Sequence, residues 1–420
     1  MSKLARQACS LTTRDSVAPY QIVRKRSTIN LEFFRMARFI FFTKTRWNEP
    51  PRLRHQLAEL LANSGNEVLF AEHPYRPGQL KDLGFGAPSR VRLFRHGELL
   101  HHKLRVGPIA RWANAIWTSY CINKAVGEHQ IDTDDVIVNF NYDYYFLREI
   151  FPHNAIITII NDDFVTAPSK TGVPCQRFMQ ASLARAQRMT CSMSDAVLTP
   201  SVALQDQLAA YCSPELFMPW ADIAYRQPSY DDCRQFIVYW GYIGRRLDYP
   251  LISTIADRLA REQPAARLIF VGPLEGDAAD QSLFKLHSNV EVRKPTDLDE
   301  LPLNSIIGSI IPYVRGVPDV DVIVLPNKAM QLLARGLPLL ITGMPRFMEA
   351  PFVFRLDEGD PVITIRHVAK CFEDLQPPIK KFVDLNGPMA RLDQFMAVVR
   401  RVQKVRSSAL TRNPPRVPTE

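Results

Sequence analysis

Short apolar runs alternate with longer segments of helical periodicity along most of this 420-residue chain. The run 39–43 predicts a first strand, and the leucines in 53–61 lie on one face of the helix expected after it. Such alternation is typical of a parallel sheet that is buried on both faces and whose strands are joined by helices. Further strands are expected at 67–71, 135–139, 155–160, 196–199, 236–240, 267–272, 290–292, 306–312 and 337–341. We therefore predict an α/β fold with doubly wound sheets.

The length of the chain predicts two domains. A loop-like passage at 217–227, which contains Pro219, lies between two sets of expected strands, and we place the boundary near residue 225. The expected parts are a basic, disordered tail at 1–35, a first Rossmann-like domain at 36–225, a second at 226–377, and terminal helices with a basic tail at 378–420. The N-terminal tail holds seven basic residues against two acidic ones, over half of the net charge of +9, as a solvated segment would.

The composition argues against several classes of protein. The seven cysteines are scattered without a CxxC pair, which disfavours zinc ribbons and thiol redox chemistry and suits a reducing cytoplasm. No apolar run approaches the roughly 20 residues that a membrane span requires. The sequence shows no clustered metal ligands and no basic stripe interleaved with aromatic residues. We expect a cytoplasmic protein with no bound metal and no nucleic-acid partner.

A candidate phosphate site lies in the segment 326–341. Pro326 and Asn327 favour a helix start, and Gly336 suits the left-handed position that follows the end of a helix. The N-terminus of a helix carries unpaired N–H groups and positive partial charge, to which Lys328 adds a full charge. The segment therefore predicts an anion site at the start of a short helix.

A second candidate is the turn 241–246, which follows the strand expected at 236–240. Gly244 lets the backbone approach a ligand closely, and Arg245 or Arg246 can bind a phosphate through paired N–H groups. Ligands of doubly wound sheets bind at the carboxyl ends of strands. The alternative is that the glycines only form a turn and that the arginines are solvated.

These pieces, in this order, resemble GT-B glycosyltransferases of the GT4-like type over most of residues 38–360. The resembling pieces are 38–57, 66–74, 161–164, 194–201, 241–244, 270–273, 289–292, 311–313 and 326–328. The resemblance implies a GT-B architecture, in which two Rossmann-like domains face a cleft and terminal helices often cross back to the first domain. It also implies a nucleotide-diphosphate sugar as donor substrate and retention of anomeric configuration, with no metal and no cofactor.

The resemblance implies a donor site in the second domain. The residues expected to bind the donor are Gly241, Gly244, Arg245, Arg246, Gly272, Pro326, Asn327, Lys328 and Gln331. The family commonly has a glutamate where this chain has Gln331, and another eight positions earlier, where it has Ile323. Gln331 can still donate and accept a hydrogen bond to a ribose. Asp319 and Asp321 can replace the missing carboxylates or be plain loop residues.

The candidate catalytic residues are Asp162, Asp163, Arg245 and Lys328. Arg245, Arg246 and Lys328 would stabilise the charge that develops on the leaving diphosphate. Asp162 and Asp163 follow a strand and suit a base for an acceptor hydroxyl, although a role as a helix cap is an equal alternative. The basic loop and helix start at 44–55 can meet the phosphates or the acceptor.

Ile109, Trp112, Ala113, Ile116 and Tyr120 recur at helical spacing, with basic residues nearby. We expect this apolar face to pack on the domain core. The alternative is an interfacial helix that lies on anionic lipid, so a peripheral membrane contact stays open.

We expect a glycosyltransferase that moves a sugar from a nucleotide-diphosphate donor to a saccharide or lipid-linked acceptor in polysaccharide assembly, at the cytoplasmic side of the membrane. The first rival is a non-catalytic GT-B scaffold that binds a sugar or a partner transferase, because the paired glutamates are missing. The second is a nucleotide-sugar epimerase, which would need a set of acid and base carboxylates that the sequence does not show.

Overall fold

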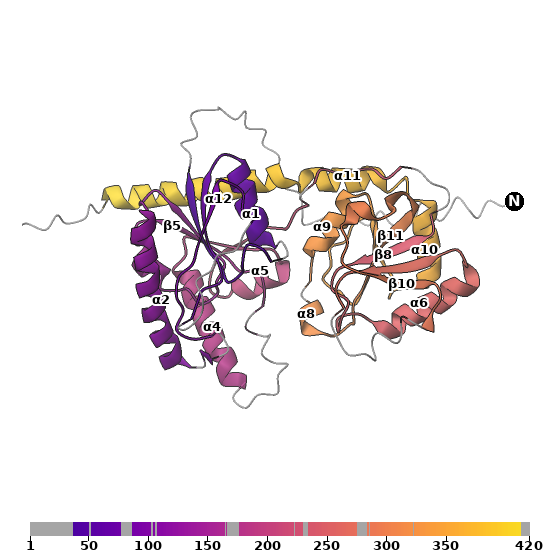
Figure 1. Cartoon of the computed structure of the whole chain (residues 1–420), viewed down its shortest axis with the longest axis horizontal. Helices are drawn as coiled ribbons and strands as arrows, with labels where there is room; N and C mark the ends of the chain where they lie inside the picture. The colour runs from indigo at the N-terminus through magenta and orange to yellow at the C-terminus, as the bar shows by residue number, and fades with distance from the viewer. Residues whose placement is uncertain are drawn as a thin grey trace, which may run out of the picture. The chain divides into compact units, whose positions relative to one another are not determined.

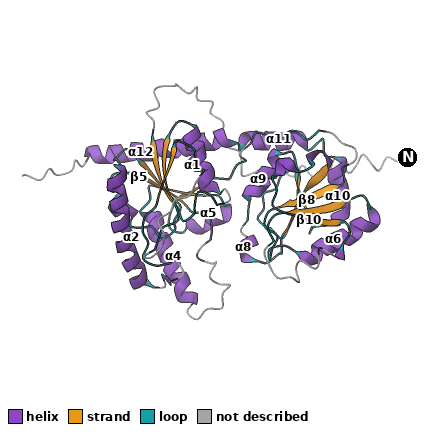
Figure 2. Cartoon of the chain, viewed as in Figure 1, coloured by secondary structure: helices purple, strands orange, loops and turns teal. Residues whose placement is uncertain are grey.

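The protein is described by a computed structural model that covers residues 37–49, 52–76, 86–101, 104–105, 107–163, 165, 176–221, 223–229, 234–274, 284, 286–321 and 323–412. The expected N-terminal tail lies outside the described residues. Two parallel sheets, each with helices packed against it, make up the described chain (Figures 1 and 2). The predicted α/β class is confirmed.

The first sheet contains seven strands in the order β3-β2-β1-β4-β5-β6-β7, and every neighbouring pair is parallel. Its strands are β1 (Arg38–Phe42), β2 (Glu67–Ala71), β3 (Val91–Phe94), β4 (Val136–Asn139), β5 (Ala155–Ile159), β6 (Ala196–Thr199) and β7 (Pro214–Leu216). Its helices are α1 (Leu53–Asn63), α2 (Pro108–His129), α3 (Leu147–Ile150), α4 (Gln176–Ser192) and α5 (Val202–Leu208).

The central strand β1 is apolar throughout because both faces of the sheet are covered. Phe39 and Phe41 belong to one core cluster, whereas Ile40 and Phe42 belong to the cluster on the opposite face. Successive side chains of a strand point to opposite faces, so the unbroken apolar run follows from burial on both sides.

The last helix, α12 (Pro388–Arg412), completes the core of the first sheet. The Phe395 ring lies 6.1 Å from the Phe39 ring, and Val399 is buried in the same cluster. The first core is therefore built from segments at nearly opposite ends of the chain.

The second sheet contains six strands in the order β10-β9-β8-β11-β12-β13, again all parallel. Its strands are β8 (Phe236–Trp240), β9 (Arg267–Val271), β10 (Val290–Arg293), β11 (Ile306–Pro312), β12 (Leu339–Thr342) and β13 (Val353–Arg355). Its helices are α6 (Tyr249–Glu262), α8 (Pro318–Asp321), α9 (Asn327–Ala334), α10 (Pro361–Lys370) and α11 (Gln376–Leu385), with 3-10 turns at Leu298–Glu300 and Leu303–Ser305. The chain passes from the first sheet to the second between Leu216 and Phe236.

Helix α2 differs from the expectation. Ile109, Trp112, Ile116 and Tyr120 are exposed, so the prediction that they pack on the core is wrong. The side chains that face the core are Asn114, Ala115, Thr118, Ile122 and Ala125, a smaller and partly polar set. Within the described part of the chain, no helix combines the length and the apolar character that crossing a membrane requires.

Candidate functional site

The most distinctive site lies where the direction of chain winding reverses in the second sheet. Strands β8 and β11 are neighbours, but the chain proceeds from β8 to β9 on one side and from β11 to β12 on the other. Such a reversal leaves a crevice at the carboxyl ends of the two central strands, where doubly wound proteins bind ligands. Tyr239 lies at the end of β8, and Tyr313 directly follows β11.

Lys328 lies between these two tyrosines. It is the second residue of α9, and its Nζ is 4.4 Å from the centre of the Tyr239 ring and 4.6 Å from that of Tyr313. The ammonium group also donates a hydrogen bond of 3.1 Å to the Tyr239 hydroxyl. Cation–π contacts and the hydrogen bond hold a positive charge at the winding reversal.

Two glycines bring the backbone close to this charge. Gly241, with φ of 139°, leaves room beside Lys328, because a Cβ built there would lie 3.2 Å from Nζ. At Gly272, with φ of 150°, a Cβ would lie 2.0 Å from the Gly241 carbonyl oxygen. The ends of β8 and β9 can approach this closely only because Gly272 lacks a side chain, whereas the missing side chain of Gly241 leaves the space that Lys328 occupies.

The N-terminus of α9 adds backbone donors. Pro326 is the N-cap and provides no side-chain acceptor, and the first turn contains no acidic residue. The helix starts with Asn327 and Lys328, so its unpaired N–H groups and the lysine charge belong to the same turn. Gly336 follows the helix with φ of 72°, the left-handed conformation that the sequence predicted.

The electrostatics favour an anion here. Burial lowers the pKa of Lys328, and the charge of Arg246 lowers it further, although Tyr313 acts in the opposite direction. Burial opposes ionisation of Tyr313, but the Lys328 charge outweighs it and lowers the Tyr313 pKa. Among the described residues, no carboxylate forms an ion pair with Lys328. A positive group without a carboxylate partner is suited to bind phosphate.

The residues of the predicted turn 241–246 have different places relative to the site. Gly244 is buried, and its carbonyl accepts hydrogen bonds from Leu247 N–H and the Tyr249 hydroxyl, so it shapes the turn. Arg245 and Arg246 are both exposed. The structure brings Arg246 within electrostatic range of Lys328.

Gln331 is buried one turn after Lys328. Its Oε1 accepts a 3.3 Å hydrogen bond from Arg335, whose guanidinium forms an ion pair with Asp299 at 2.9 Å. The side chain predicted to meet a ribose is thus engaged with Arg335 on the same helix.

The residues near the missing glutamate lie in and beside the short helix α8. Ile323 packs against the second core. Asp321 accepts a 3.2 Å hydrogen bond from the Gly316 N–H and so stabilises the preceding turn. Asp319 lies in the short helix α8.

The two aspartates after β5 have different surroundings. Asp163 accepts hydrogen bonds from the Val165 N–H at 3.2 Å and from Gln207 Nε2 at 3.3 Å, which ties the loop to α5. Asp162 is exposed and acts electrostatically on Arg54. Of the pair, Asp162 is the more accessible to a substrate.

Arg54 is a buried cation at the start of α1. It is 9 % exposed, its guanidinium lies 5.8 Å from the centre of the Phe140 ring, and its Nε has no hydrogen-bond partner among the described residues. Burial lowers its pKa to about 10, with a further contribution from Arg52 that Asp162 partly offsets.

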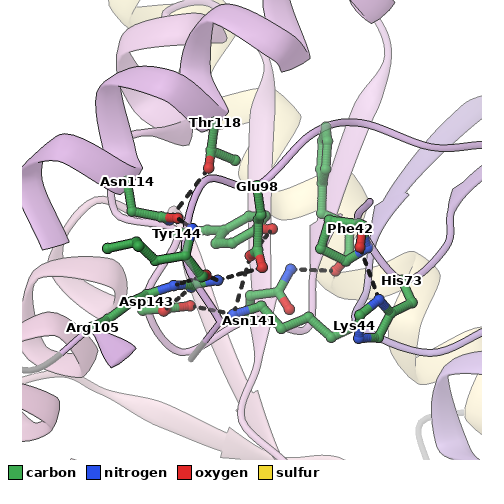
Figure 3. A network of polar contacts seen from close by, with 12 residues as sticks. Phe42, Lys44, His73, Glu98, Arg105, Asn114, Thr118, Asn141, Asp143 and Tyr144 are labelled. Carbon is green, nitrogen blue, oxygen red and sulfur yellow. Dashed lines mark hydrogen bonds and ion pairs between the residues drawn. The ribbon is translucent and has the colours of Figure 1, made fainter. Parts of the chain in front are cut away.

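A buried ionic network occupies the corresponding reversal of the first sheet, between β1 and β4 (Figure 3). Asp143 accepts hydrogen bonds from Lys44 at 2.9 Å and from Arg105 at 2.6 Å. Arg105 also pairs with Glu98, which accepts a 2.8 Å hydrogen bond from the Tyr144 hydroxyl. Lys44, in the loop expected to meet a ligand, is thus paired within the protein.

Burial opposes the charge of each carboxylate in this network, but the cations outweigh it. The charges of Lys44 and Arg105 lower the pKa of both Glu98 and Asp143. The sequence contains no spacing that links these positions, so only the fold reveals the network. Among the described residues, no group of three or more His, Cys, Asp or Glu side chains is arranged to hold a metal ion.

No protein-family model matches this sequence, and no curated protein matches it. Solved structures do match across nearly the whole chain. Sucrose-phosphate synthase from Thermosynechococcus elongatus superposes with a TM-score of 0.56 at 12 % identity, covering 90 % of this chain and 100 % of the other. Anabaena HepE, solved with UDP and glucose, has a TM-score of 0.56 at 12 % identity, and the match covers 87 % of this chain and 99 % of HepE.

An α,α-trehalose-phosphate synthase from Burkholderia vietnamiensis has a TM-score of 0.57 at 10 % identity and covers 87 % of this chain and 97 % of its own. At such identities the likeness establishes the fold. This chain therefore has the GT-B fold that the sequence resemblance implied.

Proposed function

We propose that this protein is a glycosyltransferase that moves a sugar from a nucleotide-diphosphate donor to a saccharide or lipid-linked acceptor in polysaccharide biosynthesis. The observation that carries the proposal is Lys328, held at the winding reversal of the second sheet beside Gly241 and without a carboxylate partner among the described residues. The similar structures point the same way, because they include a sucrose-phosphate synthase and a HepE complex with UDP and glucose.

The chemistry follows from where charge develops. When the bond between the sugar and the diphosphate breaks, negative charge accumulates on the leaving phosphate oxygens. Lys328, the first N–H groups of α9 and Arg246 are positive groups that are already oriented, so they stabilise this charge more than they stabilise the bound donor. Arg245 is exposed on the same turn, and we expect it to bind an outer phosphate oxygen.

The finer features of the proposal rest on the GT4-like resemblance. They are retention of anomeric configuration, transfer without a metal or cofactor, and action at the cytoplasmic side of a membrane. Asp162 is the exposed carboxylate after β5 that would orient or deprotonate the acceptor hydroxyl.

The test is thermal unfolding of the full chain against UDP-, GDP-, ADP- and dTDP-sugars. A ligand present at about 100 times its Kd should stabilise the fold by roughly 2.7 kcal/mol. We expect one nucleotide to raise the melting temperature and Lys328→Ala to abolish this rise. Lys370→Ala, a control at the exposed end of α10, should leave it unchanged. Equal shifts in the Lys328→Ala variant and the wild type would refute the site.

A second candidate function is a scaffold that binds a nucleotide sugar without turning it over. The engagement of Gln331 by Arg335 favours it, because that side chain stands where the family has a donor-binding glutamate. Release of nucleoside diphosphate in the presence of an acceptor identifies an enzyme, whereas a thermal shift without any release identifies a scaffold.

A further inference from the structure

The exposed face of α2 carries large apolar side chains in a single row. Ile109, Trp112, Ile116 and Tyr120 are 80 %, 63 %, 52 % and 65 % exposed. Their spacing of three or four residues places them on one stripe of the helix, opposite the residues that pack on the sheet. Single exposed apolar residues are ordinary, but a contiguous row of this size marks a surface that meets a partner.

The apolar row continues onto α4. A Cβ built on Gly107, directly before α2, would lie 3.2 Å from the Phe178 ring of α4, and Phe178 is 52 % exposed. Arg111 of α2 donates a 2.6 Å hydrogen bond to the Ser182 hydroxyl of α4. The two helices therefore lie side by side on the first sheet, and we call their joint outer surface the α2–α4 face (Figure 1).

The charge of this surface is mostly positive. No aspartate or glutamate occurs between Glu98 and Glu128 or between Asp163 and Asp195. The exposed charged side chains on the two helices within these stretches are Lys124, Arg177, Arg185 and Arg188. Glu128, near the end of α2, is the one exposed carboxylate on the described parts of these helices. A water-facing helix usually mixes both signs, so four exposed cations against one exposed carboxylate favour an anionic partner.

We propose that the α2–α4 face docks the protein onto the surface of an anionic phospholipid bilayer. Tryptophan and tyrosine favour the boundary between headgroups and acyl chains, because their rings are apolar and their N–H and O–H groups stay hydrated. Isoleucine and phenylalanine enter the acyl region, while lysine and arginine meet the phosphates. A protein partner would need matching carboxylates and a fixed shape, whereas a bilayer supplies phosphate wherever the cations lie.

The docking proposal does not depend on glycosyl transfer, since it can be measured without a donor. The full-length protein is sedimented with vesicles of phosphatidylcholine alone and with vesicles of equal parts phosphatidylcholine and phosphatidylglycerol. We expect binding to the mixed vesicles and much less to the neutral ones. No sedimentation with either, or equal sedimentation with both, would overturn the proposal.

The apolar part is tested by the double variant Ile109→Gln and Trp112→Gln. Loss of these two apolar side chains should weaken binding to the mixed vesicles by about tenfold or more. The control is Ile363→Gln with Met389→Gln, which removes two apolar side chains that are 60 % and 65 % exposed on other helices. If the first variant binds as the wild type does, or if it only converts a dimer to a monomer in light scattering, the face contacts a second copy of the chain or nothing at all.

The charged part is tested by Arg185→Gln with Arg188→Gln. Each cation near an anionic surface contributes about 1 kcal/mol, so each loss should weaken binding to mixed vesicles about fivefold. Arg400→Gln with Lys404→Gln changes the net charge equally on the exposed side of α12 and should have a smaller effect. If both double variants lose vesicle binding equally, the net charge of the protein attracts it to the vesicles without a defined face. That result would contradict the proposal.

Discussion

Lys328 Nζ donates to the Tyr239 hydroxyl at 3.1 Å, and that hydroxyl donates in turn to the carbonyl oxygen of Tyr242 at 2.6 Å. The chain of hydrogen bonds fixes the ammonium group relative to the backbone of the turn after β8. The Tyr239 ring contributes a cation–π contact that survives loss of the hydroxyl.

Tyr239→Phe should therefore weaken donor binding modestly. It keeps the ring and removes one hydrogen bond of about 1 kcal/mol, so the Kd measured by calorimetry should rise about fivefold. Tyr225→Phe removes a hydroxyl that donates to Gln376 instead, and donor binding should not change. If Tyr239→Phe lowers donor affinity as much as Lys328→Ala does, the Tyr239 hydroxyl contacts the donor directly.

Gly272→Ala should destabilise the second sheet. Its new Cβ would lie 2.0 Å from the Gly241 carbonyl oxygen, in a backbone conformation that side chains rarely adopt. We expect the free energy of unfolding in urea to fall by about 2 kcal/mol or more. Gly359→Ala meets nothing within 4 Å and is the control. Unchanged stability in both variants would show that the turn after β8 moves aside easily.

Asp143→Asn should cost more stability than the loss of any exposed carboxylate. It leaves the buried guanidinium of Arg105 with Glu98 as its remaining carboxylate partner, and breaking such a buried pair costs roughly 3–5 kcal/mol. Glu215→Gln breaks the exposed pair with Arg401 and should cost less than about 1 kcal/mol. Similar losses in the two variants would show that the network is solvated and not buried.

His96 should make stability depend on pH. Burial lowers its pKa to about 4, against the opposing effect of Glu98 and with smaller contributions from Lys44 and Arg105. The unfolded chain protonates this histidine near pH 6.5, so between pH 6.5 and about 4 the unfolded state binds more protons and stability falls as the pH falls. The loss should reach about 3 kcal/mol at the acidic end.

His96→Phe, which retains an aromatic ring beside Phe42 and Tyr144, should flatten the stability profile in this pH window. His153→Gln changes an exposed histidine and should not alter the profile. If the stability profiles of both His96→Phe and His153→Gln keep the slope of the wild type, the pH dependence of stability comes from carboxylates.

Arg54→Met should stabilise the fold. It replaces a buried cation whose Nε lacks a partner among the described residues with an apolar chain of similar length, which should raise the free energy of unfolding by about 1 kcal/mol. Arg391→Met is the contrast. Arg391 is also buried and its Nε also lacks a partner among the described residues, but its terminal nitrogens donate hydrogen bonds to Gln394 and Asn386, so its loss should destabilise. A destabilised Arg54→Met variant would show that the packing on Phe140 outweighs the buried charge.

The sequence predicted the central strands well because they are buried on both faces and so form unbroken apolar runs. It missed the short edge strands β3, β7 and β13. Val91–Phe94 contains an exposed arginine, and Pro214–Leu216 begins with a proline, a residue that strands accept chiefly at sheet edges and at their first position. Edge strands are half covered, so their sequence carries less of the apolar signal.

The site was predictable where its signal is local. The turn 241–246 and the start of α9 are contiguous segments whose glycines, proline and lysine indicate their backbone conformation. The cation–π contacts of Lys328 could not be predicted, because Tyr239 and Tyr313 are brought together only by the pairing of β8 with β11. The prediction that the apolar face of α2 packs on the core was wrong for a related reason. Periodicity shows that an apolar face exists but not what covers it.

The place of α12 in the first core sets an order of events during synthesis. Phe39 belongs to the first described strand, but the helix that covers it with Phe395 is made only after all the described strands of both sheets. The second sheet, which needs no later segment than α11 for its core, can therefore finish folding while the first still exposes one face. A nascent chain stalled before Pro388 should be a client of chaperones, although most of its strands have already been translated.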